Sequence, residues 1–169
     1  MATRVNASAY YGTHLPALMT CIGKTTGPVL ELGVGLFSTP YLHYACMLAG
    51  RELVSYETDA NWAKFFTEYG YPCDTHDFRI VDNWDAADLS GPWDVALVDQ
   101  SPDDSRVPAI LRLRDTAKYV VVHDADSKFD GIYHLSTVYP HFKYRKLWDI
   151  EYRKTVVLSN LVDLGNLWQ

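Results

Sequence analysis

The sequence lacks any apolar run of the roughly 20 residues that a membrane-spanning helix needs, so no membrane association is expected. Cysteine is also scarce, because Cys21, Cys46 and Cys73 are the only three and no two of them form a Cys-x-x-Cys pair. This spacing favours neither a disulfide framework nor a zinc site, and it predicts buried, reduced thiols. The start of the chain has one arginine and no apolar stretch of a secretory signal, which predicts a cytoplasmic protein.

Positive charge is in short supply as well. The chain carries 15 Lys and Arg against 21 Asp and Glu, a formal net charge of −6. Such a chain has no long-range attraction for a polyphosphate, so duplex nucleic acid is not expected as a partner. Apolar side chains, in contrast, make up 48 % of the 169 residues, which is enough for a packed core. The length predicts a single domain over residues 1–169.

Short apolar runs alternate with helical patterns along the chain, an order typical of an α/β fold with a mostly parallel sheet. Strands are expected at residues 28–33, 52–56, 77–81, 93–98 and 119–122. Helices are expected at 14–22 and 41–49 and after residues 59, 103–105 and 128. The last stretch holds two strands, 141–150 and 153–158, whose tight connection only an antiparallel hairpin can make.

Four of the helical stretches carry specific expectations. Residues 41–49 are apolar almost all round, which predicts a buried helix. The helix after residue 59 is expected to end at Gly70, and the pattern from 128 predicts one helix that Pro140 stops. After 103–105, apolar residues are expected to face the core and arginines the solvent, namely Arg106, Arg112 and Arg114.

Polar side chains gather where the expected strands end. They are Glu31, Glu57, Asp82, Asp99, His123 and Asp124. Because the carboxyl ends of parallel strands meet at one edge of a sheet, these side chains are expected to border one crevice. Any single acid at a strand end is more often a helix N-cap or a surface residue than a ligand group, so the crevice is inferred from the set as a whole.

Four segments contain most of these residues: Glu31-Leu-Gly-Val-Gly-Leu-Phe-Ser-Thr, Ser55-Tyr-Glu-Thr-Asp-Ala-Asn-Trp, Trp93-Asp-Val-Ala-Leu-Val-Asp and Tyr119-Val-Val-Val-His-Asp. They resemble the successive motifs of class I S-adenosylmethionine-dependent methyltransferases, over most of the chain from about residue 28 to 158. The resemblance implies a Rossmann-like fold with a mostly parallel seven-stranded sheet, a C-terminal antiparallel β-hairpin and helices on both faces. It also implies a core at 28–159 and a helical segment at 1–27 over the pocket.

S-adenosylmethionine is the cofactor that this resemblance implies. Gly33 and Gly35 let the backbone turn sharply and approach its methionine and ribose portions, where a side chain would clash. Glu31 would repel a pyrophosphate, but it suits the cofactor's ammonium and sulfonium cations, directly or through water. The family often has a third glycine in this loop, where the present chain has Phe37 or Ser38.

The nucleoside part of the cofactor has candidates of its own. Glu57 lies about 20 residues after the glycines, where its carboxylate can accept both ribose hydroxyls. Asp82 or Asn83 can hydrogen-bond the adenine amino group. Trp84 can stack on the adenine ring, with a core or surface tryptophan as an equal alternative.

Asp99 and His123 are the candidates beside the reacting methyl group. Methyl transfer is an in-line displacement that needs alignment and a deprotonated acceptor. Asp99 is expected to border the sulfonium and His123 to act as a base, the alternative being a strand-end histidine bonded to a loop. Asp99, Asp124 and Asp126 also suggest a Mg²⁺ site, but Ala125 separates two of these acids, and no metal is predicted.

A small molecule is the expected methyl acceptor, with oxygen preferred over nitrogen as the receiving atom. The chain reads Asp99-Gln-Ser-Pro, so it lacks the Asn/Asp-Pro-Pro-aromatic signature of many enzymes that methylate exocyclic base or amide nitrogens. Tyr10, Tyr11 and His14 either line the acceptor side or anchor the amino-terminal segment on the core. A homo-oligomer is left open, because a partner subunit can complete a compact pocket.

Two other functions compete with methyl transfer. A nicotinamide-dependent oxidoreductase would share the glycine turn and Glu57. Its short-chain reductase form needs Tyr-x-x-x-Lys on one helix, and Pro140 between Tyr139 and Lys143 argues against that helix. The second alternative is a non-catalytic S-adenosylmethionine-binding module completed by a partner protein.

Overall fold

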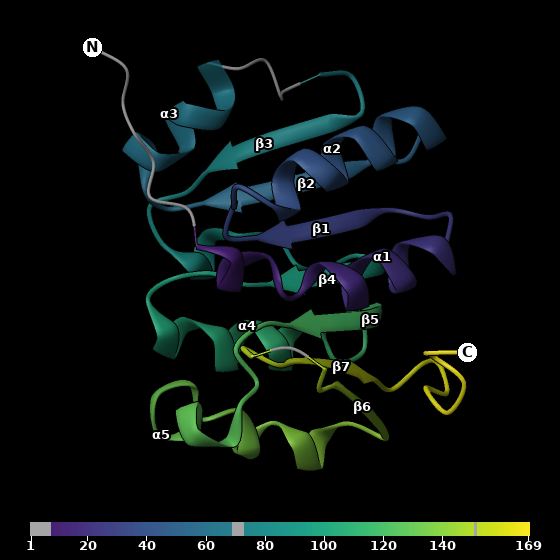
Figure 1. The fold of residues 1–169 in the computed structure, drawn as a ribbon. Helices are drawn as coiled ribbons and strands as arrows, with labels where there is room; N and C mark the ends of the chain where they lie inside the picture. Colours follow the sequence, from purple (N-terminus) through teal and green to yellow (C-terminus); the bar gives the residue numbers. More distant parts are fainter. Residues whose placement is uncertain (1–7, 69–72, 151) are drawn as a thin grey trace.

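The computed structural model describes residues 8–68, 73–150 and 152–169. Its centre is a seven-stranded sheet in the order β3-β2-β1-β4-β5-β7-β6 (Figure 1). The strands are β1 (Val29–Leu32), β2 (Leu53–Glu57), β3 (His76–Ile80), β4 (Trp93–Val98), β5 (Ala117–Val122), β6 (Tyr144–Trp148) and β7 (Thr155–Ser159). The first five strands pair in parallel, and β7 is antiparallel to both β5 and β6.

The hairpin at the end of the sheet has the predicted form. β7 inserts between β5 and β6, so that Val157 lies opposite Val121 on one side and Lys146 on the other. β1, β2, β4 and β7 are buried along their whole length, as expected for inner strands of a sheet that is covered on both faces. The predicted fold class is therefore confirmed.

Helices cover the two faces of the sheet (Figure 1). The α-helices are α1 (Leu15–Gly23), α2 (Ser38–Ala49), α3 (Ala60–Glu68), α4 (Arg106–Leu113) and α5 (Asp130–Tyr133). Along β4, Val95 and Leu97 pack with α1 and α2, whereas Ala96 and Val98 pack with α4 and α5. The alternation of a strand's side chains thus divides the core into two apolar layers, one on each face.

Short 3-10 helices occupy several connections. They are η1 (Ala9–Gly12), η2 (Trp84–Ala86), η3 (Asp103–Ser105), η4 (Ser127–Phe129), η5 (Leu135–Thr137) and η6 (Tyr139–His141). The prediction of a single helix between residue 128 and Pro140 is wrong, because this stretch is divided among η4, α5, η5 and η6. α5 ends where His134 adopts a left-handed backbone (φ 52°), and Asp130 accepts hydrogen bonds from the backbone and hydroxyl of Ser136 in place of a further helical turn.

Other local predictions also need correction. The α2 helix is not buried all round, because Tyr44 and Leu48 are 55 % and 83 % exposed. Cys21 and Cys46 are buried free thiols as predicted, but Cys73 is exposed. The predicted helix end at Gly70 lies outside the described residues. Tyr139 and Lys143 do not share a helix, since η6 ends at His141.

No helix in the described ranges is long and apolar enough to cross a membrane.

Candidate functional site

The turn after β1 comes very close to the loop after β4. Gly33 has a left-handed backbone (φ 86°), and a Cβ atom added there would lie 2.7 Å from the backbone of Asp99 and Gln100. Only glycine accommodates both the torsion angle and the contact. The structure thus gives Gly33 a cause other than the predicted approach to a cofactor, namely the contact of two loops at the carboxyl edge of the sheet, and the cofactor contact stays a prediction.

Glu57 joins the same turn to the end of β2. Its Oε2 accepts a hydrogen bond from the backbone N–H of Val34 (3.2 Å), and its Oε1 accepts from Thr58 and Asp59 (2.7 and 3.0 Å). A carboxylate has roughly four acceptor positions, so three are already used. Oε2 can accept a hydrogen bond from one ribose hydroxyl without losing a present partner. A second ribose hydroxyl would have to replace the bond from Val34, which is the longest of the three. The predicted ribose contact stays a prediction.

Glu31 lies beneath the turn and has no exposed surface. Its two carboxylate oxygens accept hydrogen bonds from Thr39 Oγ1 (2.9 Å) and Ser55 Oγ (2.6 Å). Ser55 in turn contacts His76 Nε2 at 2.9 Å, and His76 Nδ1 lies 3.1 Å from His43 Nδ1. Burial raises the pKa of Glu31 to about 7, against the lowering effect of its hydroxyl donors. The side chain belongs to a buried polar network, and its predicted contact with a cofactor cation stays a prediction.

A pH-dependent stability follows from this burial. The raised pKa of Glu31 favours the protonated folded state, so its contribution is complete below about pH 4.5 and is lost as the pH rises towards 7. We expect the wild-type protein to lose about 3 kcal/mol over that interval relative to Glu31→Gln, measured by chemical denaturation at several pH values. The altered hydrogen bonds of the glutamine amide change the free energy of unfolding by an amount that does not depend on pH. If the difference in unfolding free energy between the two proteins stayed constant with pH, the raised pKa of Glu31 would be contradicted.

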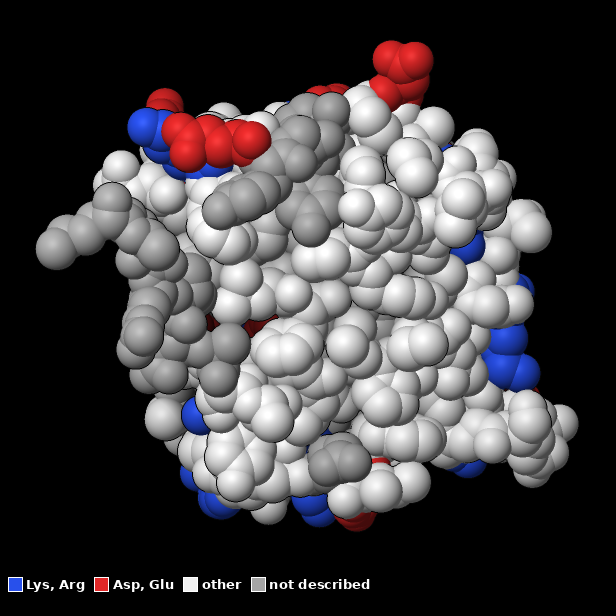
Figure 2. Space-filling view, turned by 45° about the horizontal axis from the view of Figure 1, so that its top comes forward, with Lys and Arg blue, Asp and Glu red and all other residues white. Residues whose placement is uncertain are grey.

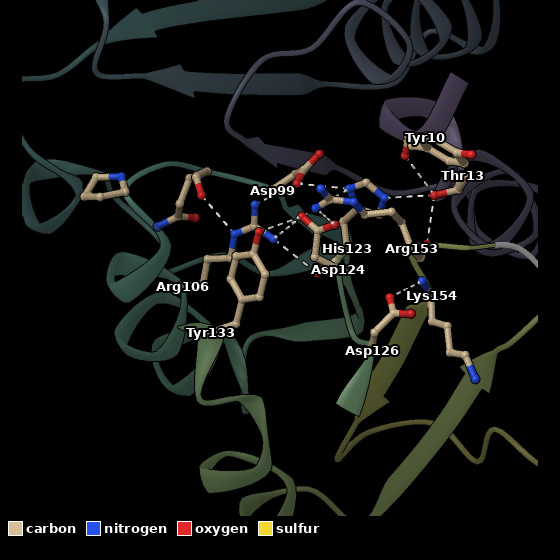
Figure 3. Close-up of polar contacts among 12 residues, drawn as sticks. Tyr10, Thr13, Asp99, Arg106, His123, Asp124, Asp126, Tyr133, Arg153 and Lys154 are labelled. Carbon is tan, nitrogen blue, oxygen red and sulfur yellow. Dashed lines mark hydrogen bonds and ion pairs between the residues drawn. The ribbon is translucent and has the colours of Figure 1, made fainter. Parts of the chain in front are cut away.

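Charged side chains from three elements meet at the ends of β4 and β5 (Figure 3). Asp99 follows β4, His123 and Asp124 follow β5, and Arg106 opens α4. Arg106 Nη2 lies 2.9 Å from Asp99 Oδ1, and its Nη1 lies 3.4 Å from Asp124 Oδ2. The prediction that Arg106 faces solvent is wrong, because its guanidinium is buried between these two acids and also donates to the carbonyl of Gln100.

Asp124 has further partners of its own. Arg153 Nη1 donates to Asp124 Oδ1 at 2.7 Å, and the hydroxyl of Tyr133 donates to Oδ2 at 3.1 Å. Asp124 also has a left-handed backbone (φ 60°), which turns the chain sharply at the end of β5. Two guanidinium groups therefore neutralise this carboxylate. Neither Arg106 nor Arg153 was among the predicted site residues.

His123 is held at both ring nitrogens. Nδ1 lies 3.3 Å from Asp99 Oδ1, and Nε2 lies 3.0 Å from Thr13 Oγ1. Burial lowers the pKa of His123, but the Asp99 carboxylate outweighs it, and the net effect is a raised pKa. Burial raises the pKa of Asp99, but His123 and Arg106 more than reverse this, so the pKa lies well below its usual range. Neither nitrogen of His123 is free in this arrangement, so the predicted role as a base requires one contact to be exchanged.

His14, directly before α1, completes the cluster. Its ring lies edge-on to that of His123, with 4.8 Å between the ring centroids. The side chain is only 1 % exposed, and neither ring nitrogen has a hydrogen-bond partner. Burial lowers the pKa of His14 to about 4. An imidazole that is buried, neutral and unpaired is unusual, because buried polar groups are nearly always hydrogen-bonded.

A cavity of about 390 Å³ opens at this edge of the sheet. Of the predicted cofactor and catalytic residues, Gly35, Asp99 and His123 line it. The other residues around it are Tyr11, His14, Leu36, Phe37, Trp62, Arg106, Asp124, Tyr133 and Arg153. Tyr11 and His14 line this cavity, whereas the ring of Tyr10 packs against that of Tyr152, and the acceptor-side role of this segment stays a prediction. Gly33 and Glu57 shape the turn behind the cavity and do not line it.

The three candidates for adenine lie elsewhere on the same edge. Asn83 Oδ1 caps η2 by accepting from the backbone of Asp85 and Ala86, and Asp82 is exposed. Trp84 is buried in the core, and its Nε1 donates to the carbonyl of Ser101 at 2.8 Å. The structure therefore agrees with the core alternative for Trp84, and contact of these residues with adenine stays a prediction.

The three acids of the Mg²⁺ alternative do not converge. Asp124 is occupied by Arg106 and Arg153, whereas Asp126 accepts from the backbone N–H of Lys154 (2.7 Å) and lines the neighbouring cavity of about 350 Å³, which Asp99 does not line. Figure 3 shows the Asp126–Lys154 pair apart from the Asp99–His123 contact. This arrangement gives no support to a carboxylate-only cation site.

Charge is distributed unevenly over the surface. Among the described residues visible in Figure 2, lysine and arginine lie at the margin of the face and do not form a continuous basic patch. Uncharged residues occupy most of its centre. This face offers no extended surface for a phosphate backbone.

No family model and no curated protein sequence matches the chain. Solved structures do match. The cofactor-bound protein Rv0187 from MTB has a TM-score of 0.66 at 18 % identity, covering 94 % of this chain and 83 % of its own. A precorrin-6y C5,15-methyltransferase from Geobacter metallireducens has a TM-score of 0.64 at 11 % identity, covering 93 % and 91 %.

An RNA methyltransferase from Salinibacter ruber, in complex with S-adenosyl-L-homocysteine, is also similar. Its TM-score is 0.55 at 18 % identity, and the match covers 92 % of both chains. At such identities the likeness concerns the fold and leaves the acceptor unresolved. Together with the strand order and the inserted β7, these matches show that the chain has the fold of class I S-adenosylmethionine-dependent methyltransferases.

Proposed function

We propose that this protein is an S-adenosylmethionine-dependent methyltransferase that acts on a small-molecule acceptor, with oxygen favoured over nitrogen. In this proposal residues 1–169 form one cofactor-binding domain, with a core at 28–159 and the segment 1–27 over the pocket. The fold of the known methyltransferases supports the class of reaction. The residues of the site support the kind of cofactor.

The observation that carries the proposal is the bare turn at Gly33 beside a charged cavity. A Cβ atom at Gly33 would meet backbone 2.7 Å away, so the turn is built from backbone alone. Acceptors surround it, with Glu57 behind the turn and Asp99 on the cavity wall. Acids and carbonyls suit a ligand that has cationic and hydroxyl groups, and they suit a pyrophosphate poorly. The residues present therefore fit S-adenosylmethionine better than a dinucleotide.

When bound, S-adenosylmethionine supplies an electrophilic methyl group. Asp99 stays ionised because His123 and Arg106 hold its pKa low, so its carboxylate remains an acceptor for a donor group of the cofactor. Arg106 and Arg153 fix Asp124 and stiffen the wall on which the acceptor would lie. The protein's main contribution is then alignment, since in-line displacement needs little beyond a well-placed acceptor. A base role for His123 is retained as part of the proposal.

The volume of the cavity and the net charge of the protein both favour a small-molecule acceptor. A volume of about 390 Å³ lies within the range of small-ligand pockets. Asp124 and Tyr133 line both this cavity and the neighbouring one of about 350 Å³, so an acceptor larger than the first cavity has adjoining space. The net charge of −6 disfavours a nucleic acid.

Calorimetry and turnover test the proposal. We expect S-adenosylmethionine to bind with micromolar affinity and NAD⁺ to show no saturable binding, because Glu57 backs the glycine turn and both arginines of the cavity are already paired with Asp99 or Asp124. Formation of S-adenosylhomocysteine with a panel of hydroxylated and amino small molecules then identifies an enzyme. Binding without turnover would favour the non-catalytic module, and binding of NAD⁺ alone would favour the oxidoreductase.

A further inference from the structure

The amino-terminal segment and the ends of β4 and β5 bring together three groups that are suitable as metal ligands. His14, Asp99 and His123 each offer one ligand atom, and these atoms all lie within 4.8 Å of one another. All three side chains line the cavity of about 390 Å³. This set differs from the three acids considered above, because it contains two imidazoles and only one carboxylate.

The hydrogen bonds of Thr13 decide where the hydrogen of His123 lies. Thr13 Oγ1 is 2.8 Å from the carbonyl oxygen of Arg153 and 3.0 Å from that of Tyr10, so two acceptors compete for its single hydrogen. When the hydroxyl gives its hydrogen to either carbonyl, it accepts a hydrogen bond from His123 Nε2, which lies 3.0 Å away (Figure 3). In the neutral ring the lone pair is therefore on Nδ1.

That lone pair faces a carboxylate. Nδ1 lies 3.3 Å from Asp99 Oδ1 and 3.8 Å from Asp124 Oδ2. Two acceptors at hydrogen-bond distance repel each other unless a positive charge lies between them. The charge is either a second proton on the ring or a metal ion bound by both groups.

His14 distinguishes between these two. A proton on His123 would satisfy Nδ1 and Asp99, but it would leave both nitrogens of the buried His14 ring without a partner, as they are in the structure. A metal ion would use one of them as a third ligand.

We propose that His14, Asp99 and His123 form a binding site for a divalent transition-metal ion, with Zn²⁺ as the best match to two nitrogen ligands and one oxygen ligand. Zn²⁺ is bound by imidazole and carboxylate at about 2.0–2.2 Å, so the three side chains move inward on binding. Thr13 on His123 and Arg106 on Asp99 hold the ligands from outside, as outer partners do in metal sites. Asp124 pairs with both Arg106 and Arg153 and offsets part of their charge.

The site is open on one side. Three protein ligands at the wall of a cavity leave a coordination position for water or for an oxygen of a ligand. A metal-bound hydroxyl loses its proton more readily, so the ion would activate a hydroxyl acceptor, and His123 would then act as a ligand instead of a base. That catalytic role rests on the proposed function, whereas binding of the ion does not.

Metal binding is tested on tag-free protein carrying Cys73→Ser, which removes an exposed thiol that could bind the ion elsewhere. Titration with Co²⁺ alone, followed by visible absorption, is expected to show one saturable site from which Zn²⁺ displaces the cobalt. His14→Ala is expected to weaken Co²⁺ binding by at least tenfold. His141→Ala removes an exposed histidine outside the cavity and is expected to change nothing.

The controls keep the outcome unambiguous. Far-UV circular dichroism verifies folding, and if His14→Ala does not fold, His14→Gln and Asp99→Asn replace it in the comparison. The metal site is overturned if Co²⁺ shows no saturable binding, or if the His14 and Asp99 variants bind Co²⁺ with the same affinity as the Cys73→Ser parent. Either result leaves a proton on His123 as the explanation. S-adenosylmethionine binding is measured separately in EDTA, so that failure of the proposed function is distinguished from failure of the metal site.

Discussion

Glu57→Ala is expected to weaken S-adenosylmethionine binding by more than tenfold, or about 1.4 kcal/mol. The substitution removes the acceptor proposed for the ribose, and it also releases the backbone N–H groups of Val34, Thr58 and Asp59, which fix the turn. Isothermal titration calorimetry measures the change.

The matched control for this substitution is Glu52→Ala, near the opposite end of β2, where the side chain is exposed. Its affinity for the cofactor is expected to equal that of the wild type. Thermal unfolding of both variants separates a loss of binding from a loss of structure. Unchanged affinity of Glu57→Ala would remove the ribose assignment.

Gly33→Ala is expected to destabilise the fold by about 2 to 5 kcal/mol. Part of this cost is the left-handed backbone at φ 86°, roughly 1–2 kcal/mol for a residue with a Cβ atom. The remainder comes from backbone of Asp99 and Gln100 only 2.7 Å from the new atom, which a side-chain movement cannot relieve. Urea denaturation gives the free energy of unfolding.

Gly50→Ala isolates the first of these two costs. Gly50 also has a left-handed backbone (φ 62°), but a Cβ atom there meets nothing within 4 Å. Its expected cost is therefore about 1 kcal/mol. Equal destabilisation by the two substitutions would show that the contact with the loop after β4 has no energetic weight.

The sheet could be predicted from sequence because its signals are local. Buried strands such as β1 and β4 are apolar except for one acid each, Glu31 and Asp94, and they end in glycine or acid. The chain segments between the strands have helical periodicity. The short connection before β7 admits only an antiparallel partner. The expected crevice could be placed only in part. Asp99, His123 and Asp124 line one cavity, whereas Glu31, Glu57 and Asp82 do not.

The charged wall of that cavity could not be predicted in the same way. Periodicity assigns a helical arginine to the solvent face, but Arg106 is buried because Asp99 and Asp124 converge on it from two other elements. The only sequence signal was indirect. Two strand-end acids expected at one edge need a nearby cation, and the chain offers several arginines among which spacing does not choose.

The predictions of where one helix ends and of how far another is buried were wrong for a related reason. The polar groups of Asp130 and Ser136 compete with the helical hydrogen bonds after α5, and no hydrophobic pattern reports such competition. The α2 helix is apolar on more sides than the sheet can cover, so Leu48 remains at the surface. Composition alone does not say which apolar side chains find a partner.

The hydroxyl of Thr13 donates to the carbonyl of Arg153, a residue 140 positions later in the sequence. The aromatic rings of Tyr10 and Tyr152 meet beside this link, with 4.9 Å between their centroids. Arg153 stands just before β7, which can pair only after β5 and β6 exist. Loop-closure entropy makes so distant a contact slow to form. A nascent chain that already holds β1 to β5 therefore still lacks the part of the cavity wall that Arg153 supplies.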